Sequence, residues 1–382
     1  MLNQPVKPVR SIQASPFADV YKGKKVFITG HTGFKGSWLS LWLLQLGAIV
    51  KGYALRPYTK NDHFIATNLD NDLVSTIGDI RDYSNLKKEL LDFNPEYIFH
   101  LAAQPLVRDS YLKPRDTYET NIMGTVNILN AARKLKDLKA IINITTDKCY
   151  ENIEKESGYK EKEPMGGYDP YSSSKGCSEL ITSAYRRSFF NLDKDPLSSM
   201  LASARAGNVI GGGDWCKDRI MTDSISALMN NESIKIRNPK AVRPWQHVLE
   251  PLSGYLWLAA QAEIKNKKDY AEAWNFGPKI NKLVSVQNVV EVIINNWGKG
   301  SWQDISNPNE LHEAKLLNLN IEKAEKKLNW KPTLSVKESI EMTVDWYKEY
   351  NNREQSDMKD VSLSQVSKYE KIAREQKIAW TN

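Results

Sequence analysis

A short strand that runs straight into a glycine-rich loop is the feature that most restricts the fold of this chain. Residues 24–29, KKVFIT, form an apolar run, and the loop GHTGFKG (Gly30–Gly36) follows at once. The next residues, SWLSLWLLQLGA, carry apolar side chains at helical spacing. Strand, glycine loop and helix together predict the opening of a βαβ unit that can bind a dinucleotide phosphate.

The three loop glycines have separate predicted roles. Gly30 allows the tight turn, Gly33 lets the backbone approach a pyrophosphate, and Gly36 lets helix and strand pack closely. The helix N-terminus offers free N–H groups and its positive dipole end to the phosphates. Three glycines that simply form a turn are the alternative. The candidate cofactor residues of the loop are Gly30, Thr32, Gly33, Phe34, Lys35 and Gly36.

The spacing G-x-x-G-x-x-G resembles the extended branch of the short-chain dehydrogenase/reductase superfamily and differs from the G-x-G-x-x-G of most dehydrogenases. That resemblance implies NAD as the cofactor. It places Asp79 and Ile80 beside the adenine. It also implies that the end of the fourth strand, where small residues follow, lies beside the cofactor. The residues at this end are Leu101, Ala102, Ala103 and Gln104.

The second strand, residues 48–54, ends without the acidic residue that often reads the ribose hydroxyls in NAD-specific proteins. Ala54-Leu55-Arg56 stands there instead. Arg56 is therefore a candidate contact for the cofactor, including the 2′-phosphate of NADP, or else a solvated loop charge. The choice between NAD and NADP stays open at this residue.

Strands and helices continue to alternate along the chain, which predicts an α/β fold with a doubly wound parallel Rossmann sheet and helices on both faces. A smaller C-terminal substrate-binding domain is expected beside it. The predicted bounds are 20–207 for the dinucleotide-binding domain with a returning segment near 244–283, 208–243 and 284–350 for the substrate domain, and 1–19 and 351–382 for peripheral extensions. Within the last of these, Trp380 hints at some docking.

Tyr171 and Lys175, in YDPYSSSK, are four residues apart and share one helix face. A phenol near its ordinary pKa is a poor base at neutral pH. A neighbouring ammonium favours the phenolate and lowers that pKa. Such a pair often arises by chance, but here it follows the glycine loop and a polar strand exit. Tyr168 lacks a lysine four residues on.

The polar strand exit is TTDKCY, Thr145–Tyr150, which follows the buried-type run at residues 140–144. In the superfamily this strand delivers a Ser or Thr that hydrogen-bonds the reacting sugar hydroxyl, and Thr146 matches it. Asp147 and Lys148 are surplus to simple hydride transfer. They indicate extra proton chemistry, with a solvated ion pair as the alternative.

Nucleotide-sugar 4,6-dehydratases carry Thr-Asp-Glu at this turn, and lysine in place of the glutamate resembles the members that act on CDP-glucose. The resemblance covers about residues 20–350, through GHTGFKGSWL, TTDKCYEN, MGGYDPYSSSKG, ARAGNVIGGGDW and RPWQHVLEPLSGYL. It implies a CDP-linked hexose substrate and a hydro-lyase cycle. Tyr171 takes the 4-hydroxyl proton as C4 hydride passes to NAD⁺, water leaves across C5 and C6, and then the hydride returns to C6 and a proton to C5.

The same resemblance makes Asp147 the acid for the leaving hydroxyl and puts Lys148 in the place of the C5 base. Which of the two handles which proton stays open, and Lys148 is also able to stabilise an enolate. Asn208 matches a residue that contacts the nucleotide-sugar phosphate. Arg243, in VRPWQHV, is the leading candidate to clamp the diphosphate. The other two candidates, Arg219 and Arg237, are equally well read as solvated charges.

Composition excludes few functional classes of protein, but it favours a cytoplasmic one. The formal net charge is +7, and the basic residues are scattered, which argues against nucleic acid as a partner. The three cysteines lack a metal-like spacing, so no metal is expected, and reduced thiols fit the cytoplasm. The longest apolar run, 39–50, is too short to span a membrane, and no signal peptide is visible.

Three alternatives remain at the level of sequence. A 4-epimerase or reductase would leave Asp147 and Lys148 unused, and a non-catalytic dinucleotide sensor would typically lose the Tyr–Lys pair. A dTDP-, UDP- or GDP-hexose is also possible as substrate, because cytosine rests on resemblance alone. The resemblance further implies a homo-oligomer, dimer or tetramer, that serves deoxysugar biosynthesis for a bacterial surface polysaccharide.

Overall fold

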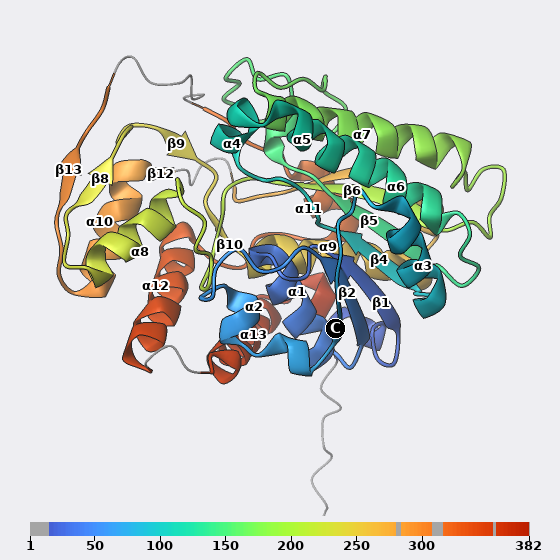
Figure 1. The fold of residues 1–382 in the computed structure, drawn as a ribbon, viewed down its shortest axis with the longest axis horizontal. Coiled ribbons are helices and arrows are strands. Elements are labelled where there is room, and N and C mark those ends of the chain that lie inside the picture. Colours follow the sequence, from blue (N-terminus) through green and yellow to red (C-terminus); the bar gives the residue numbers. More distant parts are fainter. Residues whose placement is uncertain (1–14, 280–283, 308–315, 354–356, 382) are drawn as a thin grey trace, which may run out of the picture.

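A seven-stranded parallel sheet forms the centre of the molecule (Figure 1). The computed structural model describes residues 15–279, 284–307, 316–353 and 357–381. The strand order is β11-β6-β5-β4-β1-β2-β3, and every neighbouring pair is parallel. The strands are β1 (Lys25–Thr29), β2 (Ile49–Ala54), β3 (Val74–Ile77), β4 (Tyr97–His100), β5 (Ala140–Ile144), β6 (Met200–Ala206) and β11 (Ala273–Phe276). The expected doubly wound parallel sheet is confirmed, and its strand order reverses between β1 and β4.

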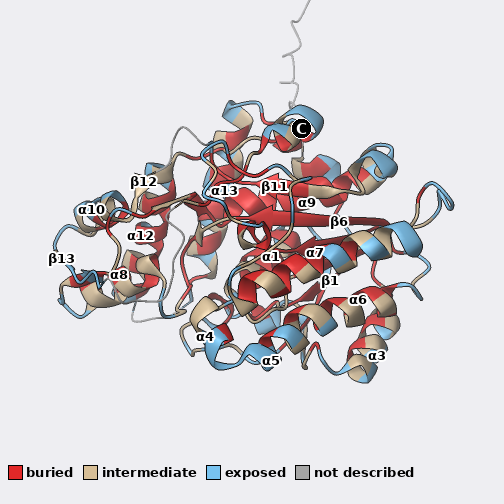
Figure 2. Cartoon of the chain, turned by 90° about the horizontal axis from the view of Figure 1, so that it is seen from above, coloured by how far each residue is buried: buried red, intermediate tan, exposed pale blue. Residues whose placement is uncertain are grey.

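Alternate residues of each central strand belong to different apolar cores on the two faces of the sheet. Val26 and Ile28 of β1 lie in one core and Phe27 in the other, and Ile142 and Ile141 of β5 divide in the same way. Because side chains alternate along a strand, a continuous apolar run can cover both faces. Figure 2 shows that strand β6 and helix α9 are buried, whereas helices α3, α5 and α6 carry exposed residues.

The helices divide between the two faces. One face is covered by α1 (Phe34–Gln45) and α9 (Leu249–Ile264), with α13 (Lys359–Glu375) packed outside α1. The other face is covered by α3 (Tyr83–Phe93), α6 (Gly124–Ala132) and α7 (Pro170–Ser188). Shorter segments are η1 (Pro16–Asp19), α2 (His63–Ala66), η2 (Leu69–Asn71), α4 (Val107–Leu112), α5 (Pro114–Tyr118), the π-helical η3 (Glu119–Met123), η4 (Asp147–Cys149), η5 (Lys267–Tyr270) and η7 (Ala379–Thr381).

A smaller lobe lies beside the carboxyl ends of the sheet strands, at the left of Figure 1. Its elements are α8 (Ile220–Met229), β8 (Ile234–Ile236), β9 (Val242–Arg243), β12 (Val284–Ser285), α10 (Val286–Trp297) and β13 (Trp302–Asp304). The connecting elements are β7 (Val209–Ile210), β10 (Gln246–His247), α11 (Glu322–Leu328) and α12 (Val336–Asn352). The exact division into two domains stays a prediction. Residues 280–283 of the predicted returning segment and 308–315 of the predicted substrate domain lie outside the described residues.

The C-terminal segment is packed far more closely than a peripheral extension would be. Helix α13 buries Ser362, Val366, Tyr369 and Ala373, a stripe at helical spacing. Trp380 is fully buried and stacks on Phe17, with ring centroids 5.0 Å apart. The expectation of a peripheral C-terminus is corrected on this point, because its polar composition conceals one apolar helix face. Residues 1–14, 354–356 and 382 of the two predicted extensions lie outside the described residues.

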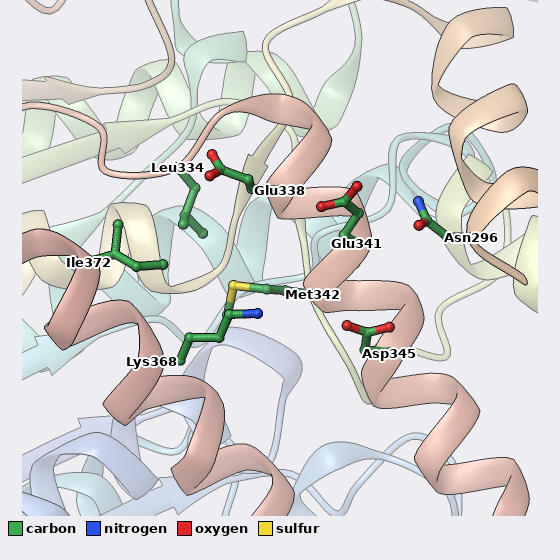
Figure 3. A pocket seen from close by; sticks show the side chains of 8 residues that line it. All are labelled: Asn296, Leu334, Glu338, Glu341, Met342, Asp345, Lys368 and Ile372. Atoms are coloured by element: carbon green, nitrogen blue, oxygen red, sulfur yellow. The ribbon is translucent and has the colours of Figure 1, made fainter.

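A small acidic groove lies between helices α12 and α13 (Figure 3). Its volume is about 300 Å³, and Glu338, Glu341 and Asp345 of α12 line it together with Lys368 of α13. Glu338 already caps its own helix, since its carboxylate accepts the backbone N–H of Ser335 at 2.7 Å. No group of three or more metal-ligating side chains occurs among the described residues. Likewise, none of the helices described combines the length and apolar character of a membrane span.

Glu250, a buried carboxylate in α9, makes the stability of this fold sensitive to pH. It accepts hydrogen bonds from the backbone N–H of Thr333 at 2.9 Å, from that of Leu334 at 2.6 Å, and from the Tyr369 hydroxyl at 2.9 Å. Burial nevertheless raises the pKa of Glu250 from 4.5 to about 7. The folded state therefore holds this proton more tightly than the unfolded chain does, so the stabilisation is complete at low pH and is lost as pH rises toward 7.

We expect this group to lower the free energy of unfolding by roughly 3 kcal/mol between pH 4.5 and pH 7.5. Urea unfolding of the wild type and of Glu250→Gln across that range measures the effect. The variant should show a flatter dependence on pH, because glutamine does not titrate. Identical slopes for the two proteins would show that Glu250 is ionised throughout.

Candidate active site

One large cavity, of about 1570 Å³, lies where the carboxyl ends of the sheet strands meet the smaller lobe. Parallel sheets of this type bind ligands at that edge. Every site residue predicted from the sequence lines this cavity. They are Gly30, Thr32, Gly33, Phe34, Lys35, Gly36, Arg56, Asp79, Ile80, Leu101, Ala102, Ala103, Gln104, Thr146, Asp147, Lys148, Tyr171, Lys175, Asn208, Arg219, Arg237 and Arg243.

The glycine loop combines two closely packed positions with one open position. A Cβ on Gly30 would lie 2.8 Å from the Ala102 backbone N, and its φ of +80° is left-handed. A Cβ on Gly36 would lie 2.1 Å from the Gly30 carbonyl O, so strand and helix meet there. A Cβ on Gly33 would approach only the Gly30 O, at 3.4 Å. Gly33 is the N-cap of α1, where no side chain caps the helix, so its backbone has the room and the N–H groups that a pyrophosphate needs.

The predicted cofactor residues beyond the glycine loop differ in whether their side chains already form hydrogen bonds with other groups of the protein. Arg56 is exposed at the end of β2. The Asp79 carboxylate accepts a hydrogen bond from Arg81 Nη2 at 2.7 Å, and that bond, against the effect of burial, lowers the pKa of Asp79. The Gln104 amide donates to Thr117 Oγ1 at 2.9 Å, so this side chain shapes its own loop.

The turn η4 presents a buried acid to the cavity. The Thr146 hydroxyl donates to Asp147 Oδ1 at 3.0 Å and accepts the backbone N–H of Lys148 at 3.4 Å. Asp147 Oδ2 is buried without a hydrogen-bond partner among the described residues. A Cβ on Gly207 would lie 3.0 Å from that oxygen, so glycine keeps space beside the carboxylate. Burial raises the pKa of Asp147, and Lys148, the Thr146 bond and Arg243 oppose that effect.

Helix α7 begins one residue before Tyr171 because two local signals meet there. The Asp169 side chain caps the helix by accepting the backbone N–H of Ser172 at 2.9 Å. Pro170 occupies the first helical position, which lacks an intrahelical partner for an N–H in any case. Tyr171 and Lys175 then lie on one face, both less than 10% exposed.

Tyr171 and Lys175 have perturbed pKa values for different reasons. Burial raises the pKa of Tyr171 to about 12, while its hydrogen bond with Thr146 and the charge of Arg219 act to lower it. Burial lowers the pKa of Lys175 to about 8, and the charge of Lys35 adds to the lowering. A tyrosine in this state needs further cationic help before it acts as a base at neutral pH.

The three predicted arginines occupy distinct positions around the cavity. Arg219 Nη1 donates to Asp214 Oδ2 at 2.5 Å, and its charge reaches Tyr171 and Lys35. Arg237 Nη1 bonds Asp218 Oδ1 at 2.8 Å, so it is tied to an acid. Arg243 lies close enough to Asp147 to influence its pKa. Arg219 therefore lies near Tyr171 and Lys35, and Arg243 lies near Asp147.

Two residues behind the turn, Glu179 and Arg205, were missed by the sequence reasoning. They form a buried ion pair of 2.7 Å. Glu179 follows Lys175 by four residues on the same helix face, which is a usable signal. Their pairing is not a sequence-local property, because Arg205 comes from β6, and it could not have been predicted from spacing.

A parallel Rossmann sheet with this glycine loop and a Tyr–Lys helix at one cavity defines an extended short-chain dehydrogenase/reductase. More specifically, the chain belongs to the GDP-mannose 4,6 dehydratase family, whose model matches residues 27–343. A CDP-glucose 4,6-dehydratase from Salmonella typhimurium is 49% identical over 91% of this chain and 97% of its own length.

Solved structures share the fold at lower identity. DesIV, a dTDP-glucose 4,6-dehydratase from Streptomyces venezuelae solved with NAD bound, has a TM-score of 0.73 and 22% identity over 86% of this chain and 98% of its own. The epimerase Mth375 from Methanothermobacter thermautotrophicus also has a TM-score of 0.73, with 22% identity over 87% of this chain and 94% of its own. The fold therefore serves both dehydratases and epimerases, and the choice between them depends on the site.

Proposed function

We propose that this protein is a hydro-lyase that converts CDP-glucose to CDP-4-keto-6-deoxyglucose and water. The observation that carries the proposal is the buried Asp147 carboxylate, with one oxygen lacking a partner among the described residues, beside Thr146 in the cavity that Tyr171 lines. An epimerase does not need such an acid. The 49% identity to a CDP-glucose 4,6-dehydratase supports the same reaction and the same nucleotide.

Tyr171 is the proposed base for the sugar 4-hydroxyl. Thr146 shares a hydrogen bond with it and can orient that hydroxyl. Lys175 is fixed on the Ile144 carbonyl at 3.2 Å and supplies positive charge at the same helix face. The Arg219 guanidinium adds a second cation that favours the phenolate.

Asp147 is the proposed acid that protonates the departing 6-hydroxyl. Its raised pKa favours the protonated form, as a general acid requires. Lys148, half-buried in the same turn, takes the C5 proton or holds the enolate oxygen by its charge. These roles are assigned to neighbouring side chains on one turn, so elimination occurs without movement of the sugar between sites.

NAD⁺ is the proposed cofactor, held by the glycine loop at its pyrophosphate and by Asp79, Ile80 and the Leu101–Gln104 segment along its length. When bound, NAD⁺ would supply the acceptor for the C4 hydride and, once reduced, the hydride for C6. The open backbone at Gly33 fits the pyrophosphate. Arg56, exposed just beyond the end of β2, is a proposed contact for the ribose end of the cofactor.

Because no carboxylate stands at residues 54–56 to repel a 2′-phosphate, we expect NADP⁺ to bind measurably, though more weakly than NAD⁺. Calorimetric titration of the wild type and of Arg56→Ala tests this. The variant should lose about tenfold in NADP⁺ affinity and little in NAD⁺ affinity, since only the former has the extra anion. Tighter binding of NADP⁺ than of NAD⁺ to the wild type would overturn the cofactor assignment.

A panel of CDP-, dTDP-, UDP- and GDP-hexoses tests the substrate. Mass spectrometry should find the loss of one water with CDP-glucose at a kcat/KM well above that of the others. Dehydration of another nucleotide sugar alone would keep the reaction and reject cytosine. A product of unchanged mass that is inverted at C4 would identify an epimerase instead.

We also propose a cytoplasmic location and a homo-oligomeric state. The three cysteines are free thiols, which suits a reducing compartment. Exposed apolar side chains along α4, α5 and α7 support a contact between copies; they are Tyr111, Leu112, Tyr118 and Leu180. Sedimentation velocity measures the state directly, and a monomer at micromolar concentration would reject it.

A further inference from the structure

A buried ion pair lies directly behind the catalytic turn. Arg205 Nη2, on β6, donates to Glu179 Oε2, on α7, at 2.7 Å, and both side chains are only 4% exposed. Ser203 Oγ donates to the same oxygen at 2.7 Å. Burying two charges is expensive unless they are paired and hydrogen-bonded. Such a pair therefore adds little to the stability of the fold by itself, and its role depends on which groups it positions.

The pair holds both ends of the turn that contains Thr146, Asp147 and Lys148. At one end, the Thr145 hydroxyl donates to Glu179 Oε1 at 2.5 Å. At the other end, Arg205 Nη1 donates to the Tyr150 hydroxyl at 2.5 Å, and the guanidinium lies 4.8 Å from the centre of the Tyr150 ring. The three proposed catalytic residues lie between these two anchors.

The anchors are themselves fixed to the far edge of the sheet. The Tyr150 hydroxyl donates to Asn275 Oδ1 at 2.8 Å, and Asn275, on β11, donates to the Tyr159 carbonyl at 2.7 Å. The Tyr150 and Tyr159 rings stack with centroids 5.1 Å apart. The turn is thus bonded through buried groups to α7, β6 and β11, so its geometry is set by the sheet rather than by the loop itself.

We propose that Glu179 and Arg205 are positioning residues, which fix the turn from Thr145 to Tyr150 against the helix of Tyr171, and that the charge of Glu179 acts on Lys175, one helical turn before it. Neither residue lines the cavity, so both act through others. The proposal rests on the proposed function only for the catalytic role of the turn, because the hydrogen bonds that hold the turn do not depend on the substrate.

The electrostatic part follows from the groups that face Lys175. On its own helix the ionised Glu179 raises the pKa of Lys175, while Lys35 of the glycine loop lowers it, and burial lowers it most. Cys149 of the turn and His100 of β4 also interact with Lys175. Burial would raise the pKa of Glu179, but Arg205 and the hydroxyl donors lower it to about 2, so its charge is permanent. Glu179 is the only carboxylate in this set.

Two substitutions separate the effect of the Glu179 charge from the effect of its side-chain length. Glu179→Gln keeps the size and removes the charge, so Lys175 should lose its proton at lower pH. We expect kcat to fall about 10- to 100-fold with KM within about threefold, and the alkaline limb of the kcat–pH profile to move down by about one pH unit. Glu179→Asp keeps the charge and shortens the reach to Thr145, so the limb should stay in place while kcat falls.

Ser203→Ala is the matched control, because it removes one hydrogen bond from the same carboxylate and leaves the charge. Its pH profile should coincide with that of the wild type. If Glu179→Gln does not fold, the double variant Glu179→Gln with Arg205→Met removes the buried unpaired cation and gives the same readout.

Hydrogen–deuterium exchange provides a second readout that needs no substrate. The peptide that covers residues 145–150 should exchange faster in Glu179→Gln and Glu179→Asp than in the wild type. A folded Glu179→Gln variant with wild-type kcat, pH profile and exchange would overturn the positioning role. A wild type that turns over no nucleotide sugar, with faster exchange in the variants, would reject the proposed function and leave this inference intact.

Discussion

Tyr171→Phe is expected to lower kcat for dehydration by about 10³-fold or more, because it removes the base that starts the cycle. The phenol is buried beside Thr146, and phenylalanine fills the same space, so the fold should be retained. KM should change little, since the hydroxyl acts mainly on the reacting proton. Steady-state kinetics on CDP-glucose, with circular dichroism to verify folding, measures the effect.

Tyr185→Phe provides the matched control for that variant. Tyr185 lies on the same helix, α7, but is partly buried against the core on the α3 and α6 face of the sheet and does not line the cavity. It should retain wild-type kcat. If Tyr171→Phe kept more than a tenth of the wild-type kcat, another group would be the base and the role proposed for Tyr171 would be wrong.

Asp147→Asn should lower dehydration by about 10²- to 10³-fold while leaving the steps at C4 and C5 intact. Asparagine keeps the shape of the buried side chain but has no proton to give to the leaving hydroxyl. In D₂O the variant should therefore return CDP-glucose with deuterium at C5 and little 6-deoxy product. NMR of the recovered sugar gives both quantities from one sample.

Lys148→Met decides which residue handles which proton. If Lys148 is the C5 base, this variant should lose C5 exchange as well as dehydration, whereas Asp147→Asn keeps the exchange. Loss of exchange in Asp147→Asn and its retention in Lys148→Met would reverse the two roles. Retained exchange with slow dehydration in both variants would leave Lys148 as an electrostatic partner of the enolate.

Features encoded by neighbouring residues were the ones that the sequence could predict. The Gly30, Gly33 and Gly36 spacing and the Tyr171 and Lys175 spacing each fix a local geometry, and strand alternation fixes the sheet. The resemblance to dehydratases then predicted the catalytic roles of Asp147 and Lys148 in the turn. These features brought the predicted site residues to one cavity.

Features that depend on tertiary contacts could not be read in the same way. Helix α13 is polar overall, so its packing against α1 could not be predicted from composition, although Trp380 beyond it hinted at the docking that its burial confirms. The pairing of Glu179 with Arg205, like that of Arg237 with Asp218, joins residues 19 or more positions apart in the sequence. Side-chain charge alone does not tell which arginine is solvated and which is bonded, because the partner is supplied by the fold.

The most direct test of the dehydratase assignment uses CDP-glucose that carries deuterium at C4. The purified protein with NAD⁺ should give a product that has lost one water and carries that deuterium at C6, as seen by mass spectrometry and NMR. Such transfer requires oxidation at C4 and return at C6 within one bound sugar. Recovery of CDP-glucose unchanged, or inverted only at C4 with no loss of water, would contradict the account.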